Sequence, residues 1–526
     1  MKEIYYKNKL TAVGNHIKLK KYQDFDAGTR TGLTLEETPD GAVLQLKAAG
    51  EADGTWISPV IDVESPFNDL IVSWNTSTPR GTDVEVFARV YLPEYDGWMT
   101  PEGHSCSGWT DWITWGKWST HVARNCPYQQ DSHPRKGNLK SNGWVYSSSR
   151  YFMGDSSLNV RGKITASAMQ LKVVFHAEED CTHLPMLRQL TATWKNTLDP
   201  DWQSHCSYPE EPITPAKSVL LNTPAMSQMV RDPDYARVVC SATCIAMLLS
   251  GRGEDILPED VTLANYDYGF GGNGNWSYSC AAAGEYGYES YVSYASFESL
   301  RQELTKGYAV ALSVKYTNRK KDTLPYLTNG PCRTPGHLIT VVGYYFNEKL
   351  QEYVYYSNDP AAKSDGHTAH REYRQSELDK CWYRRAAYFV HDRVASAPQS
   401  ARTYINAELL PAERDAEEPD KPVSWMLMSG GSRVTIPPNF LEERRARFGS
   451  HGTICYYIVG DEVSLPDTCR RVTANHFFHY GGFSVTEDGC LTFEDDAMTK
   501  LLAEGKEVKL YVINNSGTMW IADCKL

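Results

Sequence analysis

The chain has 526 residues, of which 41% are hydrophobic and 22% are charged, a composition typical of a globular protein with about three domains. Its net charge of -12 argues against nucleic acid or an anionic membrane surface as the main partner, because both attract basic proteins. No apolar run is long enough to cross a bilayer, so we expect no membrane span.

The first residues, Met1 to Tyr6, are polar and lack the apolar centre of a secretory signal. We therefore expect no signal peptide in this chain. Its compartment is left open: cytoplasmic, or secreted if a leader has been removed. The 13 cysteines are too few for a disulfide scaffold and odd in number, so at least one is unpaired or reactive.

Residues 1–205 are predicted to form a β-sandwich. Between residues 30 and 200, short β-type runs alternate with turns that contain glycine, proline or serine, without helical periodicity. The clearest runs are residues 42–46, 69–74, 84–91 and 169–175.

A group of metal-ligand residue types lies within this first domain, but we predict no metal site. The group consists of His104, Cys106, His121, Cys126 and His133. These residues lack the paired spacing of a zinc site.

Two stretches rich in proline and polar residues, 198–215 and 397–422, are interpreted as linkers. Between them, residues 216–396 mix helical and strand patterns, which predicts an α+β domain. Residues 420–526 are predicted to form a small β-rich domain of unknown role. The strongest β-type runs of this last domain are residues 453–459 and 508–513.

Cys240 is the candidate nucleophile, because it lies at the start of a predicted helix that ends at Gly251. The apolar positions that follow it at helical spacing are Ala242, Ile245, Ala246 and Leu249. The N–H groups at a helix start are unpaired and carry partial positive charge, which favours a thiolate over a thiol.

A predicted hairpin supplies the base for this thiol. His337 opens one strand, and Asp359 ends the next. With a turn at residues 347–349, His337 lies directly opposite Asp359, where the carboxylate can accept a hydrogen bond from the imidazole. A shift of one residue would place Asn358 there instead. We predict His337 as the general acid and base and Asp359 as the group that orients it.

Two donors are predicted to stabilise the oxyanion that forms on the attacked carbonyl. The backbone N–H of Cys240 is one, and the side-chain amide of Gln228, 12 residues upstream, is the candidate for the other. In the expected reaction the Cys240 thiolate attacks a carbonyl, His337 protonates the leaving amine, and water hydrolyses the thioester.

Three further residues are candidates for the wall of a substrate cleft. Asn275 and Trp276 follow a glycine-rich stretch, residues 269–274, and Gly336 precedes the predicted base. The stretch around Trp276 is equally compatible with a packed loop. Its glycine spacing does not match a phosphate-binding loop, so we expect no nucleotide and, more generally, no cofactor.

The order and spacing of these segments resemble the papain-like cysteine peptidases related to the bacteriocin-processing double-glycine peptidases. The segments that carry the resemblance are 227–229, 240–244, 274–276, 284–292, 336–337 and 358–361. The resemblance covers about residues 218–394. It implies a papain-like fold with Gln228, Cys240, His337 and Asp359 in the family's oxyanion, nucleophile, base and orienting positions.

The β-rich region before these segments is similar to the accessory domain that precedes such peptidases in bacterial proteins. The motifs that carry this similarity are residues 56–61 and 107–112.

The sequence thus predicts a cysteine peptidase that acts on a peptide or protein substrate. The same thioester chemistry would serve an acyltransferase or an amidase. A third alternative is a catalytically silent protein whose N-terminal domain binds a glycan or a protein ligand.

Overall fold

The computed structural model describes two parts of the chain. The first is residues 4–397 without 7–8, 51–52, 80–81, 100–102, 104, 120–149, 155, 178, 180, 182, 231–235, 255, 257, 266 and 268–271. The second consists of residues 432–435, 453–459, 469–473, 484–485, 490–493, 503–505, 508–514 and 519–524. The predicted second linker, from residue 398 on, lies outside the described residues, as do His104, His121, Cys126 and His133.

The N-terminal part forms two sheets. The first contains β1 (Ile4–Tyr6), β2 (Lys9–Ala12), β4 (Thr29–Thr31), β7 (Gly54–Ile57), β8 (Val60–Phe67), β10 (Thr82–Met99), β11 (Ser105–Trp109), β12 (Ile113–Trp118) and β15 (Ala166–Ala177). The second contains β3 (His16–Leu19), β5 (Leu33–Thr38), β6 (Gly41–Leu46), β9 (Asp69–Ser77), β13 (Tyr151–Gly154), β14 (Ser157–Val160) and β16 (Met186–Lys195). The short helices α1 (Tyr22–Asp26) and η1 (Trp202–His205) accompany them.

The burial of the strands explains how these sheets are placed. In β15 nearly every second residue is fully buried, as expected of a strand with one face on a core. In β9 all nine residues are buried, so both faces of this strand are covered. The described part of the chain is rich in strands and has few helices, and the predicted strands at residues 42–46, 69–74, 84–91 and 169–175 are present.

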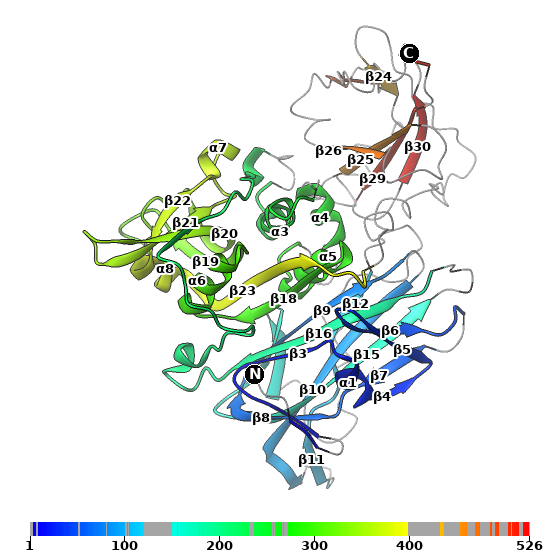
Figure 1. Ribbon diagram of the computed structural model, residues 1–526, viewed down its shortest axis with the longest axis vertical. Helices are drawn as coiled ribbons and strands as arrows, with labels where there is room; N and C mark the ends of the chain where they lie inside the picture. The colour runs from blue at the N-terminus through cyan, green and yellow to red at the C-terminus, as the bar shows by residue number, and fades with distance from the viewer. Residues whose placement is uncertain are drawn as a thin grey trace.

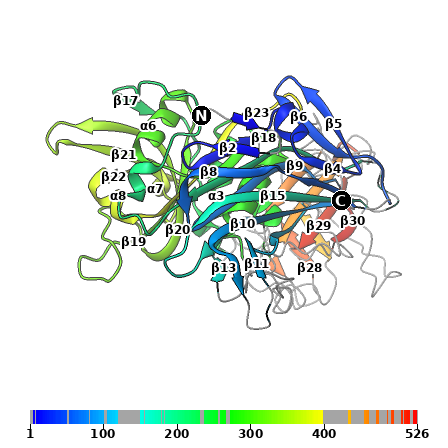
Figure 2. The ribbon, with the colours of Figure 1, turned by 90° about the horizontal axis from the view of Figure 1, so that it is seen from below.

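The middle part is built on one sheet with the order β18-β23-β19-β20-β21-β22, with β17 paired to β20 (Figures 1 and 2). Its strands are β17 (Ser218–Leu220), β18 (Tyr288–Tyr294), β19 (Val310–Thr317), β20 (Arg333–Asn347), β21 (Glu352–Asn358), β22 (Arg371–Arg374) and β23 (Trp382–Arg393). Its helices are η2 (Gln228–Val230), α3 (Cys240–Ser250), α4 (Pro258–Ala264), α5 (Trp276–Glu285), α6 (Phe297–Lys306), α7 (Asp365–Thr368) and α8 (Gln375–Cys381).

This sheet is covered on both faces, and the period of two along β20 divides its residues between two cores. Leu338 and Val342 pack into the core that holds α3 and α5. Ile339 and Val341 pack into a second core with residues of α6 and α8. The mixed helix and strand pattern predicted for this part of the chain is therefore present.

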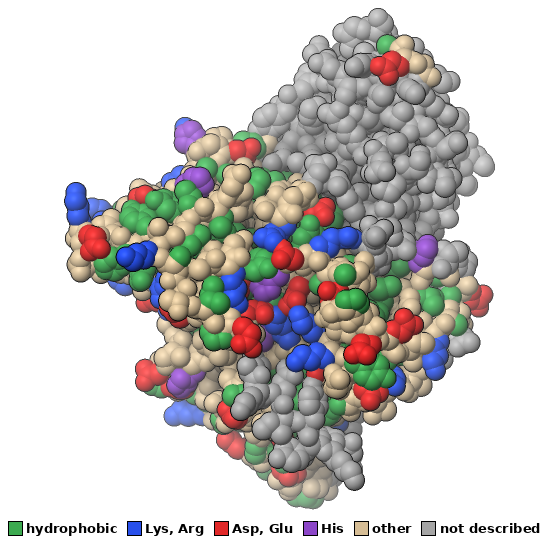
Figure 3. Space-filling model, in the orientation of Figure 1, with side chains coloured by type: hydrophobic (Ala, Val, Ile, Leu, Met, Phe, Trp, Pro, Cys, Tyr) green, Lys and Arg blue, Asp and Glu red, His purple; other side chains and the backbone are tan. Residues whose placement is uncertain are grey.

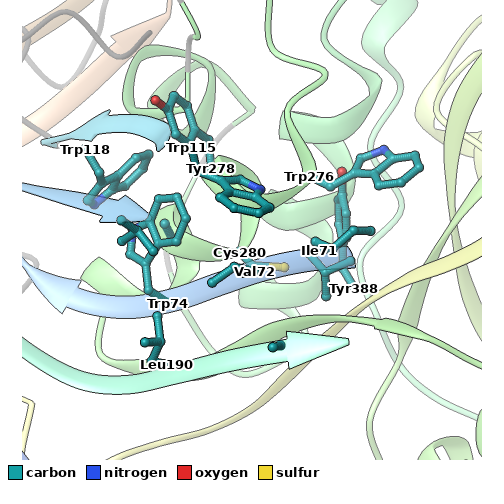
Figure 4. Close-up of a cluster of buried hydrophobic side chains, with 14 of the residues drawn as sticks. Ile71, Val72, Trp74, Trp115, Trp118, Leu190, Trp276, Tyr278, Cys280 and Tyr388 are labelled. Atoms are coloured by element: carbon teal, nitrogen blue, oxygen red, sulfur yellow. The ribbon is translucent and has the colours of Figure 1, made fainter. Parts of the chain in front are cut away.

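The N-terminal sheets and the helix layer share one hydrophobic core (Figure 4). Helix α5 lies against β9, and its Tyr278 meets Trp118 and Trp74 with ring centroids 5.2 and 6.0 Å apart. Such aromatic pairs stabilise packing beyond the area they bury. The two parts are therefore joined by their cores as well as by the linker at residues 198–215.

Polar groups reinforce this junction. The buried Glu285 carboxylate, at the end of α5, accepts hydrogen bonds from the Thr76 and Thr78 hydroxyls and from Trp118 Nε1, at 2.7–2.9 Å. On β18, Ser290 exchanges two hydrogen bonds with the side chain of Asn75. A buried carboxylate is tolerated only with such partners, so these contacts fix the position of α5 and β18.

We expect Gly284→Ala to destabilise the protein by about 1–3 kcal/mol through overpacking of this junction. A Cβ at position 284 would lie 2.9 Å from the Asn75 Cα, so the backbones of α5 and β9 would have to separate. Chemical denaturation of both proteins measures the loss. Gly366→Ala, in α7, is the control, because its Cβ would meet nothing within 4 Å. An equal loss in the two variants would contradict the prediction.

Beyond residue 397 the described residues form two small sheets. Their strands are β24 (Ser432–Thr435), β25 (Thr453–Val459), β26 (Cys469–Thr473), β27 (Ser484–Val485), β28 (Cys490–Phe493), β29 (Val508–Asn514) and β30 (Met519–Cys524). The predicted runs at 453–459 and 508–513 are strands, and the domain limits 1–205, 216–396 and 420–526 stay predictions. Among the described helices, none has the length and hydrophobicity needed to cross a membrane.

Candidate active site

Cys240 is the first residue of α3, as the sequence predicts. Val239 is the residue before the helix, and its carbonyl accepts the first helical hydrogen bond, from the Thr243 N–H. The N–H of Cys240 therefore lies ahead of the helical ladder, where it can serve an external acceptor. The following nine residues, Ser241 to Leu249, are all buried, so the core holds the helix and its thiol in place.

The Cys240 thiol contacts the ring of His337, at the start of the buried part of β20. Burial alone would raise the pKa of the thiol. The hydrogen bond and the charge of His337, with the N–H groups of Leu338 and Ser241, outweigh burial and lower this pKa below its ordinary value of 9.0. The helix and the hairpin therefore meet at the pair of residues that the sequence predicts.

His337 is held by Asp359. Its Nε2 lies 2.9 Å from Asp359 Oδ1, and both side chains are buried. Burial alone would lower the pKa of His337, but the Asp359 carboxylate, followed by Cys240, raises it to about 10. Because Nε2 faces the carboxylate, Nδ1 is the ring nitrogen left to face the thiol.

Two tyrosines that the sequence analysis did not identify fix Asp359. The hydroxyls of Tyr316 on β19 and Tyr373 on β22 donate to Oδ2 at 2.8 and 2.7 Å, and the Ala361 N–H donates to Oδ1. Burial would raise the pKa of Asp359, but His337 and these hydroxyls lower it, so the carboxylate stays ionised. No local pattern marks the tyrosines, because both lie on other strands.

The predicted register of the hairpin is wrong, although the predicted contact forms. The turn runs over residues 348–351, and Thr340 pairs with Asn358, so continuing this register places Asp359 opposite Ile339. A longer turn and a bulge between residues 341 and 343 shift the pairing. His337 and Asp359 are instead diagonal neighbours on one face, a relation that long side chains can span.

Gln228 lies in η2 and is buried, and its backbone N–H bonds to the carbonyl of Pro360, next to Asp359. Its side-chain Nε2 donates to the Ala236 carbonyl at 2.7 Å, and Oε1 has no hydrogen-bond partner among the described residues. The structure thus ties Gln228 to the segment after Asp359. An amide with one N–H still available fits an oxyanion donor, and this role stays a prediction.

The three cleft-wall candidates differ in their surroundings. Asn275 caps α5 by accepting from the Tyr278 N–H and donates to Asp267, so its groups already have structural partners. Trp276 is only 5% exposed. Gly336 is exposed beside His337, and a Cβ there would meet nothing within 4 Å. The structure therefore leaves Gly336 as the accessible member of this group.

One group of described residues has the spacing of a metal site: Glu210, Glu289 and His391 bring ligand atoms within 4.8 Å of one another. Lys18, from the N-terminal sheets, bonds to both carboxylates, and His391 Nε2 bonds to Glu303 at 2.8 Å. An ammonium group between two carboxylates neutralises them as a cation would. We interpret the group as an ion-pair network between the N-terminal and middle domains. On the surface, Figure 3 shows basic and acidic side chains close to one another.

Comparisons with known families agree with this architecture. Residues 220–389 match the model of the Peptidase_C39 like family. Residues 15–194 match the model of the Peptidase C39 N-terminal domain. The predicted resemblance to this family, with an accessory domain ahead of the matching region, is confirmed.

Two solved structures show only faint similarity. Digestive procathepsin L 3 from the larval midgut of Tenebrio molitor is 14% identical, with a TM-score of 0.25 over 35% of this chain and 72% of that chain. The glycoside hydrolase domain of Endo-D from Streptococcus pneumoniae R6 is 13% identical, with a TM-score of 0.17 over 41% of this chain and 32% of that chain. Both scores are low, and neither likeness bears on function. None of the curated proteins compared with the sequence matches it.

Proposed function

From the relation of residues 220–389 to the Peptidase_C39 like family, we propose that the chain is a cysteine peptidase. The observation that carries this proposal is the line of contacts from the Cys240 thiol through the His337 ring to the Asp359 carboxylate. A nucleophile, a base and a group that orients the base are the parts that covalent acyl transfer needs.

The proposed reaction starts from a thiolate and an imidazolium. The Cys240 sulfur attacks the peptide carbonyl, and the Cys240 N–H and the Gln228 amide donate to the oxyanion. His337 then gives its proton to the leaving nitrogen as the C–N bond breaks, which leaves a thioester. Finally, His337 takes a proton from water as the water attacks the thioester, which releases the carboxylic acid and restores Cys240.

Other uses of the same residues remain as alternatives. An acyltransferase would pass the thioester to an amine instead of water, and an amidase would act on an amide outside a peptide chain. A catalytically inactive protein that binds a glycan or a protein ligand through its N-terminal domain needs no thiolate. The lowered pKa of Cys240 favours the enzymes over this last alternative.

Iodoacetamide alkylation near neutral pH tests the proposed pair of groups. We expect Cys240 to react first, because its thiolate persists below the pH at which ordinary thiols ionise. In His337→Ala the hydrogen bond and the charge of His337 are lost, and only the N–H groups of Leu338 and Ser241 still oppose burial. The pKa of Cys240 therefore rises, and its alkylation rate at neutral pH falls by about tenfold or more. Mass spectrometry of the alkylated peptides locates the reactive cysteine.

Cys332 is an internal control in the same experiment. Like Cys240, Cys332 is partly buried, but burial raises the pKa of the Cys332 thiol. We expect Cys332 to react slowly in both proteins, because the loss of His337, whose charge lowers the pKa of Cys332, can only slow its reaction further. Equal labelling of the two cysteines in the unmodified chain would contradict the proposal.

A further inference from the structure

A cavity of about 910 Å³ lies between the two domains. This volume lies within the range of small-ligand sites. The N-terminal domain lines it with Asp69 and Lys195, among others, and the middle domain with Lys315, Tyr383 and Arg384. Trp202, from the linker, adds an aromatic wall. The cavity therefore exists only in the joined protein.

The cavity reaches the strand next to the candidate base. In the pairing of β19 with β20, Val314 lies opposite His337 and Tyr316 lies opposite Thr334, so Lys315 is beside Gly336. Val314 and Tyr316 point into the core of α6 and α8. Because side chains alternate along a strand, Lys315 points to the other face of the sheet, on which the core with α3 and α5 packs.

A distortion of β23 builds the far wall of the cavity. Arg384 and Arg385 are consecutive residues in the left-handed region, with φ of 55° and 59°, a conformation unfavourable for arginine. The pairing of β23 with β19 is irregular at the same point. The bulge directs the Arg384 guanidinium across the domain boundary, where it donates to Ser157 and Asn159 and pairs with Asp69.

The charges that line the cavity do not cancel. Among the described lining residues there are four cations, Lys195, Lys315, Lys380 and Arg384, and two anions, Asp69 and Asp379. Asp69 is already paired with Lys195 and Arg384, and Asp379 is paired with Arg385. Within the described part of the chain, Lys315 and Lys380 form no ion pair, and Lys315 lies over the Tyr383 ring, 4.8 Å from its centroid.

We propose that this interdomain cavity binds a carboxylate of the peptide substrate through Lys315 and Lys380. The proposal rests on the proposed peptidase function and adds a substrate class to it: peptides with an acidic group on one side of the scissile bond. Two cations without acidic partners beside aromatic walls form a site for an anion with an apolar stem. The N-terminal domain then contributes directly to specificity, because it lines one side of the cavity.

Paired peptide pools test this preference. Two pools are identical and C-terminally amidated, except that one holds Glu and the other Gln at each varied site. A third pool holds Gln and a free C-terminus, which separates a side-chain carboxylate from a terminal one. We expect kcat/KM to be about tenfold or more higher for the Glu pool or for the free-terminus pool than for the amidated Gln pool.

The variants Lys315→Gln and Lys380→Gln should lose this preference, so that their rates on the three pools become similar. Lys349→Gln, which removes an exposed charge in the turn of the hairpin, is the matched control and should keep the preference. Equal rates on all three pools, or a preference that survives in both cavity variants, would overturn the inference and leave the peptidase proposal intact.

If no pool is cleaved, the peptidase proposal fails, and binding still tests the cavity. Fluorescein-labelled pools are then titrated into the Cys240→Ala variant and followed by anisotropy. Tighter binding of a carboxylate pool that is lost in the Lys315→Gln background supports the cavity site. Equal binding of all three pools contradicts it.

Discussion

Cys240→Ala is expected to lower kcat for peptide cleavage by roughly 10⁶-fold, the size of effect seen when the nucleophile of a catalytic triad is removed. Among the described residues, Cys240 supplies the thiol that is hydrogen-bonded to the His337 ring. Without it, His337 and Asp359 have no nucleophile to activate. Cleavage of a mixed peptide pool, followed by mass spectrometry, measures the loss. The pool also identifies the bond that is cut.

Cys244→Ala is the matched control, because Cys244 lies one turn later on the same helix. Its thiol is fully buried, and burial raises its pKa far above the ordinary value, so it cannot supply a thiolate. We expect this variant to retain most of the activity and to lose some stability through the small cavity that it leaves. Full activity in Cys240→Ala would disprove the nucleophile assignment.

Asp359→Asn is expected to lower kcat by about 10⁴-fold while it preserves the shape of the site. An asparagine carries no charge, so the largest of the effects that raise the pKa of His337 disappears. Burial, which lowers the pKa of His337, is then opposed chiefly by Cys240, so this pKa falls well below about 10. The imidazole carries its proton less often, and Cys240 loses part of the positive charge that favours its thiolate.

The same variant changes how stability depends on pH. The pKa of Asp359 is lowered by folding, so its contribution is present above the unfolded value near 3.8 and is lost as pH falls through the folded value. The pKa of His337 is raised by folding, so its contribution is full below 6.5 and is lost as pH rises toward about 10. The unmodified protein should therefore be more stable than Asp359→Asn, and the difference in the free energy of unfolding should be largest between about pH 4 and 6.5.

Denaturant titrations across this pH range measure the difference in the free energy of unfolding. NMR titration of the His337 ring provides a second readout that a merely packing role of Asp359 would not change. A His337 pKa that is the same in both proteins would refute the orienting role.

The parts of the site that follow from local pattern were predictable from sequence. The start of α3 at Cys240 follows from apolar residues at helical spacing, and the contact of His337 with Asp359 follows from two strands and a short connection. These features depend on residues close together in the chain. The hairpin register was not predictable, because turn length and a bulge decide it.

What depends on distant segments could not be predicted from the sequence. Tyr316 and Tyr373 reach Asp359 from strands that only the sheet order brings beside it. The left-handed Arg384 has no local sequence signal, since glycine or asparagine is the usual residue there. The burial of β9 on both faces also depends on a helix some 200 residues further along the chain.

The core that α5 shares with β9 has a consequence for how this protein responds to cleavage of its own chain. A single cut in the linker at residues 198–215 would leave Trp118, Tyr278 and the Glu285 contacts untouched. The two fragments would then remain associated as a two-chain protein, as long as the buried surface is not exposed to denaturant. Separately produced halves would each present an uncovered apolar face, so they should associate with each other or aggregate.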